Sequence, residues 1–337
     1  MLVKRFQNKV AESRMSLPFT AVYALLVCLG CGFWEQQLWW QFAVLAVSSF
    51  LMMELNNANA LIRIYSRMVS CSFIVFVVMA KFLLVSLPCG IVQLFFIAFF
   101  LFFFKAYQDK RATGTVFYAF AMLGIASTQF VQILYFLPVA FVLLFTNILA
   151  GTARTLCAAL MGVLTPYWFV GGYCVYADKL DALVGHVQGL WTFAPIADIS
   201  VLDLHQIVTF VLLAFVSVVG MVHFHRNSYK DKIRTRMLFE TFTTFNLIIM
   251  VFMVLQPQHF NSLLGMLIVS TAPQTGHFIS LTNTKLTNKQ WQEREKAHPC
   301  ATTVHETLCL VKTFFLHMKI AFNPVKTTKA ANTIIEH

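Results

Sequence analysis

The sequence predicts an all-α fold, a polytopic transmembrane helical bundle of about ten spans with both termini in the cytoplasm. Only 12% of its 337 residues are charged, whereas soluble globular proteins carry roughly 25%. Long apolar runs recur along the chain, and about 20 helical residues are needed to cross a bilayer core of about 30 Å. These runs are uniformly apolar and do not alternate with polar residues, which excludes membrane-spanning strands.

The apolar runs give ten predicted spans. The fifth and sixth are nearly continuous, and we predict a tight hairpin between them at Gln129 and Gln132, which are the only polar residues there. Gly32, Gly90, Gly124 and Gly162 are candidate points of close helix contact. In chain order, the predicted spans are 17–33, 39–55, 68–87, 90–104, 115–128, 133–150, 156–176, 205–224, 238–255 and 262–281.

The positions of the basic residues predict the orientation of these spans. Of the 25 Lys and Arg residues, all but Lys81 and Lys179 fall in alternate connections or in the two terminal segments. Because cytoplasmic connections are enriched in Lys and Arg, this distribution places both termini inside. It depends on the hairpin after Gln129, since one missed span would invert every later connection.

The net charge of +11 has the same explanation. The basic residues lie beside apolar runs, which is the pattern of cytoplasmic connections next to a leaflet with anionic lipids. We therefore expect the lipid bilayer and other membrane proteins as partners, and we expect no binding of nucleic acid. Residues 1–283 form the predicted transmembrane domain, and 284–337 form a basic cytoplasmic tail. An apolar patch within 304–322 favours an interfacial helix there, with a partial span as the alternative.

A polar stretch, "MMELNNANALIRIYSRM", interrupts the apolar sequence between the second and third spans. If the stretch is helical, Asn56, Asn59, Arg63 and Arg67 recur at spacings of three and four and share one face. One interpretation is a solvated inner connection with snorkelling arginines. The other is a polar pocket in which Glu54 and the asparagines meet a substrate or another connection.

Two ionisable residues fall inside predicted spans, where such residues are costly and are functional candidates. Lys81 lies near the outer end of the third span, from which it either snorkels outward or pairs with an acid. His277 lies in the last span beside Pro273 and Gly276. A helix interrupted by Pro and Gly either builds a transporter-type site or forms a kink packed against its neighbours.

The predicted outer connections carry further acids. Glu35 lies among Trp34, Trp39 and Trp40. The ordinary explanation of these tryptophans is an aromatic belt at the membrane interface, and the alternative is that Glu35 acts as a catalytic base beside them. The long outer loop after Tyr176 carries four aspartates, and nothing in it supplies a complete set of metal ligands. These four aspartates are Asp178, Asp181, Asp198 and Asp203.

Catalytic and cofactor motifs are missing from the sequence. There is no Walker motif, no Gly-rich dinucleotide fingerprint, no H-E-x-x-H and no G-x-S-x-G. These absences argue against ATP-driven pumping by this chain alone and against the common hydrolases. We expect no cofactor and no metal, and the eight cysteines are expected to act mainly as small apolar residues in helix packing.

Four stretches carry a resemblance: "LNNANALIRIYSRM", "KAYQDKRATGTVFYAFAMLGIAST", "AALMGVLTPYWFVGGY" and "TAPQTGHFISLTNTKLTN". In order and spacing they resemble a family of uncharacterised multi-pass inner-membrane proteins of Bacteroidetes-type bacteria, as far as about Asn288. The resemblance implies a bacterial inner-membrane location and no particular activity. The family has a further span after "LTN", where this chain becomes polar. A looser likeness, across 117–168, is to the repeated helix pairs of C-type membrane glycosyltransferases, which use acids in the first outer loop. Only Glu35 occupies that region here.

Three functional hypotheses follow. The first is a non-enzymatic component of envelope biogenesis, which sparse intramembrane charge and short connections favour. The second is a transporter or flippase for an amphiphilic or lipid-linked solute, which requires Lys81, His277 and the inner polar stretch to face one cavity. The third is a glycosyltransferase-like enzyme with a polyprenyl-phosphate-sugar donor, which requires Glu35 and the acidic outer loop to converge.

Overall fold

The structure is a computed structural model that describes residues 13–30, 37–192 and 202–281. The chain divides into two compact units, Met1–Leu281 and Thr282–His337, and the predicted tail lies outside the described residues. Within the described ranges every regular element is a helix. The α-helices are α2 Ser16–Gly30, α3 Trp39–Asn59, α4 Met68–Met79, α5 Lys81–Val85, α6 Leu87–Lys105, α7 Thr113–Gln129, α8 Leu137–Thr146, α9 Ala153–Tyr176, α10 Leu180–Gln188, α11 Leu204–Asn227, α12 Ile233–Leu255 and α13 Phe260–Leu281. Short 3₁₀ segments are η1 Val131–Phe136, η3 Ser228–Lys230 and η4 Pro257–His259.

Helical segments occupy all ten predicted spans. Among the described residues, four helices are long and apolar enough to cross a membrane: α6, α9, α12 and a stretch that joins α11 to η3. Three further apolar helical stretches are shorter, at Ser16–Gly30, Met68–Met79 and Val131–Thr146. The third predicted span is broken into α4 and α5 at Ala80, whose ψ of 60° departs from helical geometry.

Successive helical segments run up and down, so that alternate connections meet at the same end. The predicted hairpin is present: after α7 and the 3₁₀ turn at η1, α8 returns the chain until Ile148 O accepts a hydrogen bond from Gln108 N at 2.8 Å. Asn147 Nδ2 donates to Met237 O at 3.3 Å, and Arg63 lies against the turn before α12. We call this end, with connections 60–67, 106–112, 147–152 and 228–232, the basic end.

The remaining connections meet at the opposite end, which we call the far end. There, Gln206 Nε2 at the start of α11 donates to Asn261 Oδ1 at the start of α13, over 3.0 Å. His186 Nε2 on α10 lies 2.9 Å from Ser127 O on α7. The ring of Phe130 meets that of His259 edge-on, with centroids 5.5 Å apart.

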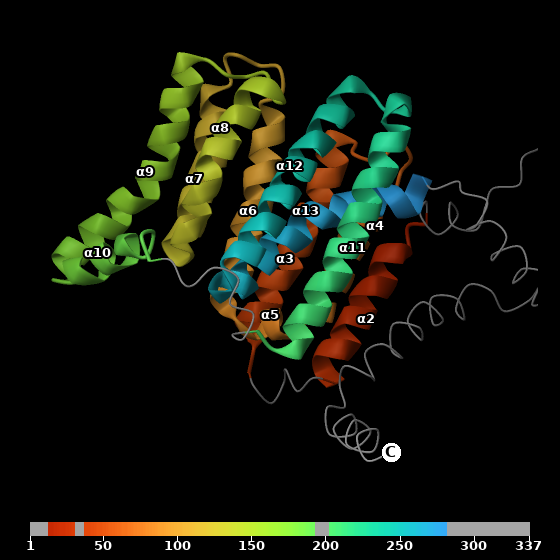
Figure 1. The fold of residues 1–337 in the computed structure, drawn as a ribbon, viewed down its shortest axis with the longest axis horizontal. Helices are drawn as coiled ribbons and strands as arrows, with labels where there is room; N and C mark the ends of the chain where they lie inside the picture. Colours follow the sequence, from red (N-terminus) through yellow and green to blue (C-terminus); the bar gives the residue numbers. More distant parts are fainter. Residues whose placement is uncertain (1–12, 31–36, 193–201, 282–337) are drawn as a thin grey trace, which may run out of the picture. The chain divides into compact units, whose positions relative to one another are not determined.

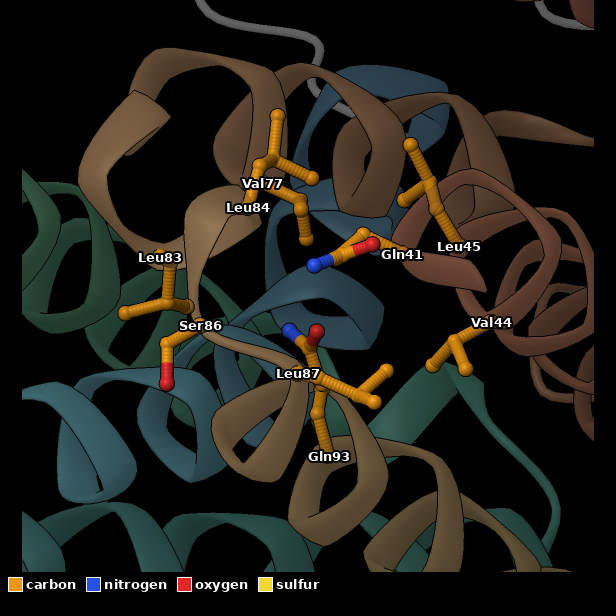
Figure 2. Close-up of a pocket in the computed structure, with 10 residues that line it drawn as sticks. Gln41, Val44, Leu45, Val77, Leu83, Leu84, Ser86, Leu87 and Gln93 are labelled. Atoms are coloured by element: carbon orange, nitrogen blue, oxygen red, sulfur yellow. The ribbon is translucent and has the colours of Figure 1, made fainter. Parts of the chain in front are cut away.

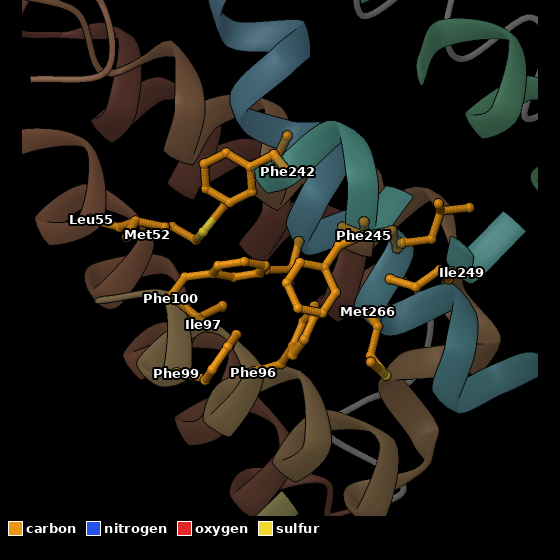
Figure 3. Close-up of a cluster of buried hydrophobic side chains, with 14 of the residues drawn as sticks. Met52, Leu55, Phe96, Ile97, Phe99, Phe100, Phe242, Phe245, Ile249 and Met266 are labelled. Carbon is orange, nitrogen blue, oxygen red and sulfur yellow. The ribbon is translucent and has the colours of Figure 1, made fainter. Parts of the chain in front are cut away.

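Phenylalanine rings fill the interior between α6 and α12 (Figure 3). Phe96, Phe99 and Phe100 of α6 are fully buried and pack against Phe242 and Phe245 of α12. Ring centroids in this group are 4.8–6.1 Å apart, within the range of favourable edge-on and offset pairs. Since lipid tails are as apolar as these rings, close packing rather than the expulsion of water accounts for this core.

Two helices differ from the rest in how they are surrounded. Helix α13 contacts α4, α6, α11 and α12, and Figure 1 shows it beside α11 and α12. Helix α9 packs mainly on α7, where two glycines permit close approach: a Cβ on Gly162 would lie 2.5 Å from Phe117 O, and one on Gly124 would lie 2.8 Å from Val163 O. The predicted contacts at these two glycines are therefore present.

Candidate functional site

The principal charged cluster of the described residues is centred on Asp231, in the short turn before α12. Its side chain is fully buried, and its backbone N–H donates to Ser228 O at 2.9 Å. Arg63 Nε lies 2.8 Å from Oδ1, and His277 Nε2 lies 3.2 Å from Oδ2. A buried carboxylate is tolerated only when it is paired and hydrogen-bonded. Asp231 therefore joins three segments that are far apart in the sequence.

His277 lies among aromatic rings near the basic end of α13. Its side chain is fully buried, and the rings of Phe224 and Phe239 lie 5.3 and 5.0 Å from its own, centroid to centroid. His223 of α11 is also close, at 5.9 Å. An ionised carboxylate only accepts hydrogen bonds, so the 3.2 Å contact suits a His277 tautomer that carries its proton on Nε2. Its Nδ1 is buried and has no hydrogen-bond partner.

The polar stretch between α3 and α4 supplies Arg63. Helix α3 ends at Asn59 because Ala60 takes a left-handed conformation with φ 46°. The predicted shared helical face is therefore wrong for Arg63 and Arg67, which lie in the non-helical connection beyond it. Buried Asn56 holds this connection by donating to Ser66 O at 2.8 Å.

Further contacts attach this connection to other helices. Ser66 Oγ and Ser280 Oγ are 3.1 Å apart, and Arg63 Nη1 donates to Lys230 O at 3.4 Å. Asn59 Oδ1 accepts a hydrogen bond from Arg234 Nη2 at 3.1 Å. The asparagines thus bind backbone and basic side chains of the protein itself, and Glu54, one turn away, is half-buried.

A second polar cluster lies deeper, between α11, α12 and α13. Asn246 Nδ2 donates to Ser217 Oγ at 2.8 Å and to Gln274 Oε1 at 3.2 Å. Asn246 Oδ1 accepts from Ser270 at 3.1 Å and from Thr271 at 3.2 Å. All five residues are fully buried. The sequence analysis missed this cluster, although Ser270, Gln274 and His277 recur at helical spacing and share a face of α13.

Two hollows among the described residues are small. One, of about 20 Å³, lies beside the break between α4 and α5, with Gln41 and Gln93 at its wall (Figure 2). Such a volume is suited to a single water molecule. The other, of about 190 Å³, is an apolar groove whose wall includes Tyr167, Leu183 and His186. Ligand pockets for small molecules usually measure about 300–1,000 Å³, so neither matches a typical solute site.

No protein-family model, curated protein or solved structure matches this chain. Function has to be argued from the side chains themselves. The described residues contain no group of three or more His, Cys, Asp or Glu side chains arranged to hold a metal ion. What they do contain is a charged cluster, Arg63–Asp231–His277, and a neutral network around Asn246, each of which includes residues of α13.

The other predicted site residues lie elsewhere. Lys81 begins α5 at the far end and is half-buried. Asp178 and Asp181 are exposed at the turn between α9 and α10, and neither lines either hollow. Asp203 precedes α11, where its N–H donates to Gln206 Oε1 at 3.0 Å in a capping arrangement. Glu35 and Asp198 lie outside the described residues.

Proposed function

We propose that this chain is a multi-pass protein of the bacterial inner membrane and acts as a non-enzymatic component of an envelope-biogenesis assembly. In this proposal all ten helical segments cross the bilayer, with both termini in the cytoplasm. The up-and-down course and the gathering of basic connections at one end support that topology. The inner-membrane location rests on the family resemblance, and the envelope role rests on the sparse intramembrane charge and the short connections.

One observation favours a structural role over transport or catalysis. The interior between α6, α11, α12 and α13 is filled by phenylalanine rings and by polar groups that bind one another. Neither of the two hollows described above reaches the volume of about 300–1,000 Å³ that is typical of ligand pockets. A transporter needs a binding cavity near the bilayer midplane, and an enzyme needs a cleft in which reacting groups meet.

The topology is tested with single cysteines in a background that lacks the native cysteines. Asn57 is exposed at the basic end and Gly185 is exposed on α10 at the far end. Asn57→Cys is expected to react with a membrane-impermeant maleimide only after the cells are opened, and Gly185→Cys in intact cells once the outer membrane is permeabilised. Labelling of both positions from the same side would contradict the proposed topology.

A proton-linked transporter is the second candidate, and the observation that favours it is the contact between buried Asp231 and buried His277, with Arg63 beside them. Buried acids and histidines in membrane helices mark proton pathways. His277 and Gln274 lie one turn apart on α13, so the charged cluster borders the neutral network around Asn246. In this candidate, protonation of Asp231 or His277 would accompany solute movement along α13.

Flux measurements separate the two candidates. The purified protein is reconstituted in vesicles that enclose a pH-sensitive dye, and an inward proton gradient is imposed with and without candidate amphiphilic solutes. The structural role predicts no protein-dependent proton flux. A flux abolished by Asp231→Asn and retained in the exposed control Asp203→Asn would establish the transporter instead. The glycosyltransferase hypothesis gains no support, since its described acids Asp178, Asp181 and Asp203 line neither hollow.

A further inference from the structure

The two ends of the helical bundle differ sharply in charge. The connections of the basic end and the residues that flank them, 60–67, 105–112, 147–154 and 226–236, contain eleven basic residues and two acids, Asp109 and Asp231. The far-end segments 80–90, 129–137, 177–192, 202–206 and 255–262 contain two lysines and three aspartates. The basic residues of the basic end are Arg63, Arg67, Lys105, Lys110, Arg111, Arg154, Arg226, Lys230, Lys232, Arg234 and Arg236.

The two acids of the basic end neutralise few of these cations. Asp231 is shared between Arg63 and His277 and is fully buried. Asp109 accepts a hydrogen bond from the backbone N–H of Arg111 at 2.8 Å. Among the described residues of the basic end, the only Lys or Arg ion pair is that of Arg63 with Asp231. Most of the positive charge at this end therefore has no acidic partner in the part of the chain that the structure describes.

Several of these cations lie over aromatic rings. Lys230 Nζ is 5.1 Å from the centre of the Tyr229 ring, and Lys105 Nζ is 5.4 Å from that of Phe102. Arg234 lies 5.6 Å from the Tyr107 ring. Tyrosines are enriched at the level of the lipid headgroups, where one end of the ring is apolar and the other is wet. An anionic lipid headgroup at this level would contact both the basic groups and the aromatic rings.

The positive charge is densest at the start of α12. Lys230, Lys232, Arg234 and Arg236 fall within seven residues, and the first turn of this 23-residue helix contains no acid. The N-terminus of a helix is itself positive, so these side chains add to its potential and repel one another. Arg234 is held in place by Asn59 Oδ1 at 3.1 Å, while Lys230 and Lys232 are exposed.

We propose that the start of α12 binds the phosphate groups of anionic phospholipids, with Lys230, Lys232 and Arg234 as the contacting cations and Tyr107 and Tyr229 at the headgroup level. Membrane insertion brings this end to a leaflet surface and keeps lipid phosphates at a high local concentration. The inference rests on the membrane part of the proposed function and not on the envelope role. Each exposed lysine is expected to contribute about fivefold to the preference for anionic lipid.

The test uses the full chain in nanodiscs that contain equal parts of phosphatidylglycerol and phosphatidylcholine. The protein is then released into detergent, and the lipids that stay bound to it are identified and quantified by native mass spectrometry. We expect retained phosphatidylglycerol, and a loss of tenfold or more in Lys230→Gln/Lys232→Gln. The matched control Lys179→Gln, an exposed far-end lysine, should retain lipid as the unchanged protein does. Equal retention of both lipids, or equal losses in the two variants, would overturn the proposal.

Two further measurements keep the result interpretable. Lys230→Arg/Lys232→Arg preserves the charge and should retain phosphatidylglycerol, whereas a loss in this variant would show that the lysines act through folding and not through charge. Inorganic phosphate at millimolar concentration should not displace the lipid, and displacement would assign the site to free phosphate instead. Failure of the lipid preference leaves the proposed topology intact, because cysteine labelling tests that separately.

Discussion

Helices α9 and α13 have similar lengths and an internal proline, yet their surroundings are opposite. On α9, Trp168 is 81% exposed and Phe169 is 71% exposed. On α13, Gln274 and His277 are both 0% exposed. The two helices are nearly equal in average apolar character, yet α9 exposes large apolar rings whereas α13 buries polar side chains.

The difference between α9 and α13 is explained by what surrounds each helix. In a bilayer, an exposed apolar side chain contacts lipid at no cost, whereas an unpaired polar group there costs several kcal/mol. Polar side chains such as Gln274 are tolerated only where a neighbouring helix supplies a partner, as α12 does through Asn246. The hydrogen bonds that satisfy these groups also select one packing arrangement for α11, α12 and α13.

The largest expected effect is at the polar contact of α13. Asn246→Leu removes four hydrogen bonds and leaves Gln274 Oε1 buried without its donor. We expect a loss of about 2–3 kcal/mol in the free energy of unfolding. The measurement is denaturant titration of the purified protein in mild detergent micelles.

The matched control for Asn246→Leu lies on α9. Thr165 Oγ1 donates only within its own helix, to Met161 O at 2.7 Å. Thr165→Val should therefore change the stability by less than about 0.5 kcal/mol. If the two variants lose the same stability, polar burial is not what distinguishes α13 from α9.

A smaller effect is expected where α9 meets α7. In Gly162→Ala the added Cβ would lie 2.5 Å from Phe117 O, a backbone atom that cannot move aside without shifting α7. We expect a loss of about 1–2 kcal/mol in the same denaturant titration. Gly172→Ala, on the same helix with nothing within 4 Å of its Cβ, is the control and should be neutral or slightly stabilising. An equal loss in both variants would show that the close approach of α9 to α7 is not what sets the cost.

Much of the helical layout could be predicted from the sequence, because each apolar run is long enough to define a helix by itself. The hairpin after Gln129 was predictable from two polar residues. The end of α3 could not be predicted, because the left-handed conformation of Ala60 depends on the hydrogen bond by which Asn56 holds the connection at Ser66. The predicted span 262–281 covers most of α13, but the partners of its polar residues on α12 could not be predicted.

The candidate site was only half predictable for a related reason. His277 and Arg63 stand out as charged residues in or beside apolar sequence. Asp231 does not, because it follows Lys230 in a basic connection and looks like a solvated surface acid. Its burial depends on the approach of α13 and of the 60–67 connection, which are distant in the chain. Pairings of this kind are set by tertiary packing and leave no local pattern.

The smallest expected effect is a dependence of stability on pH at the turn that leads into α13. Burial lowers the pKa of His259 below its usual value of 6.5. The unfolded chain therefore binds a proton at His259 more readily than the folded chain does, so stability is complete above about pH 6.5 and falls as the pH drops below it. Lowering the pH from 7.5 to 5.5 should reduce the thermal midpoint through this residue by less than about 2 °C. His259→Gln should remove that part of the decrease, whereas His205→Gln, which alters an exposed residue at the start of α11, should leave it in place. If both variants keep the full decrease, its source is a group other than His259.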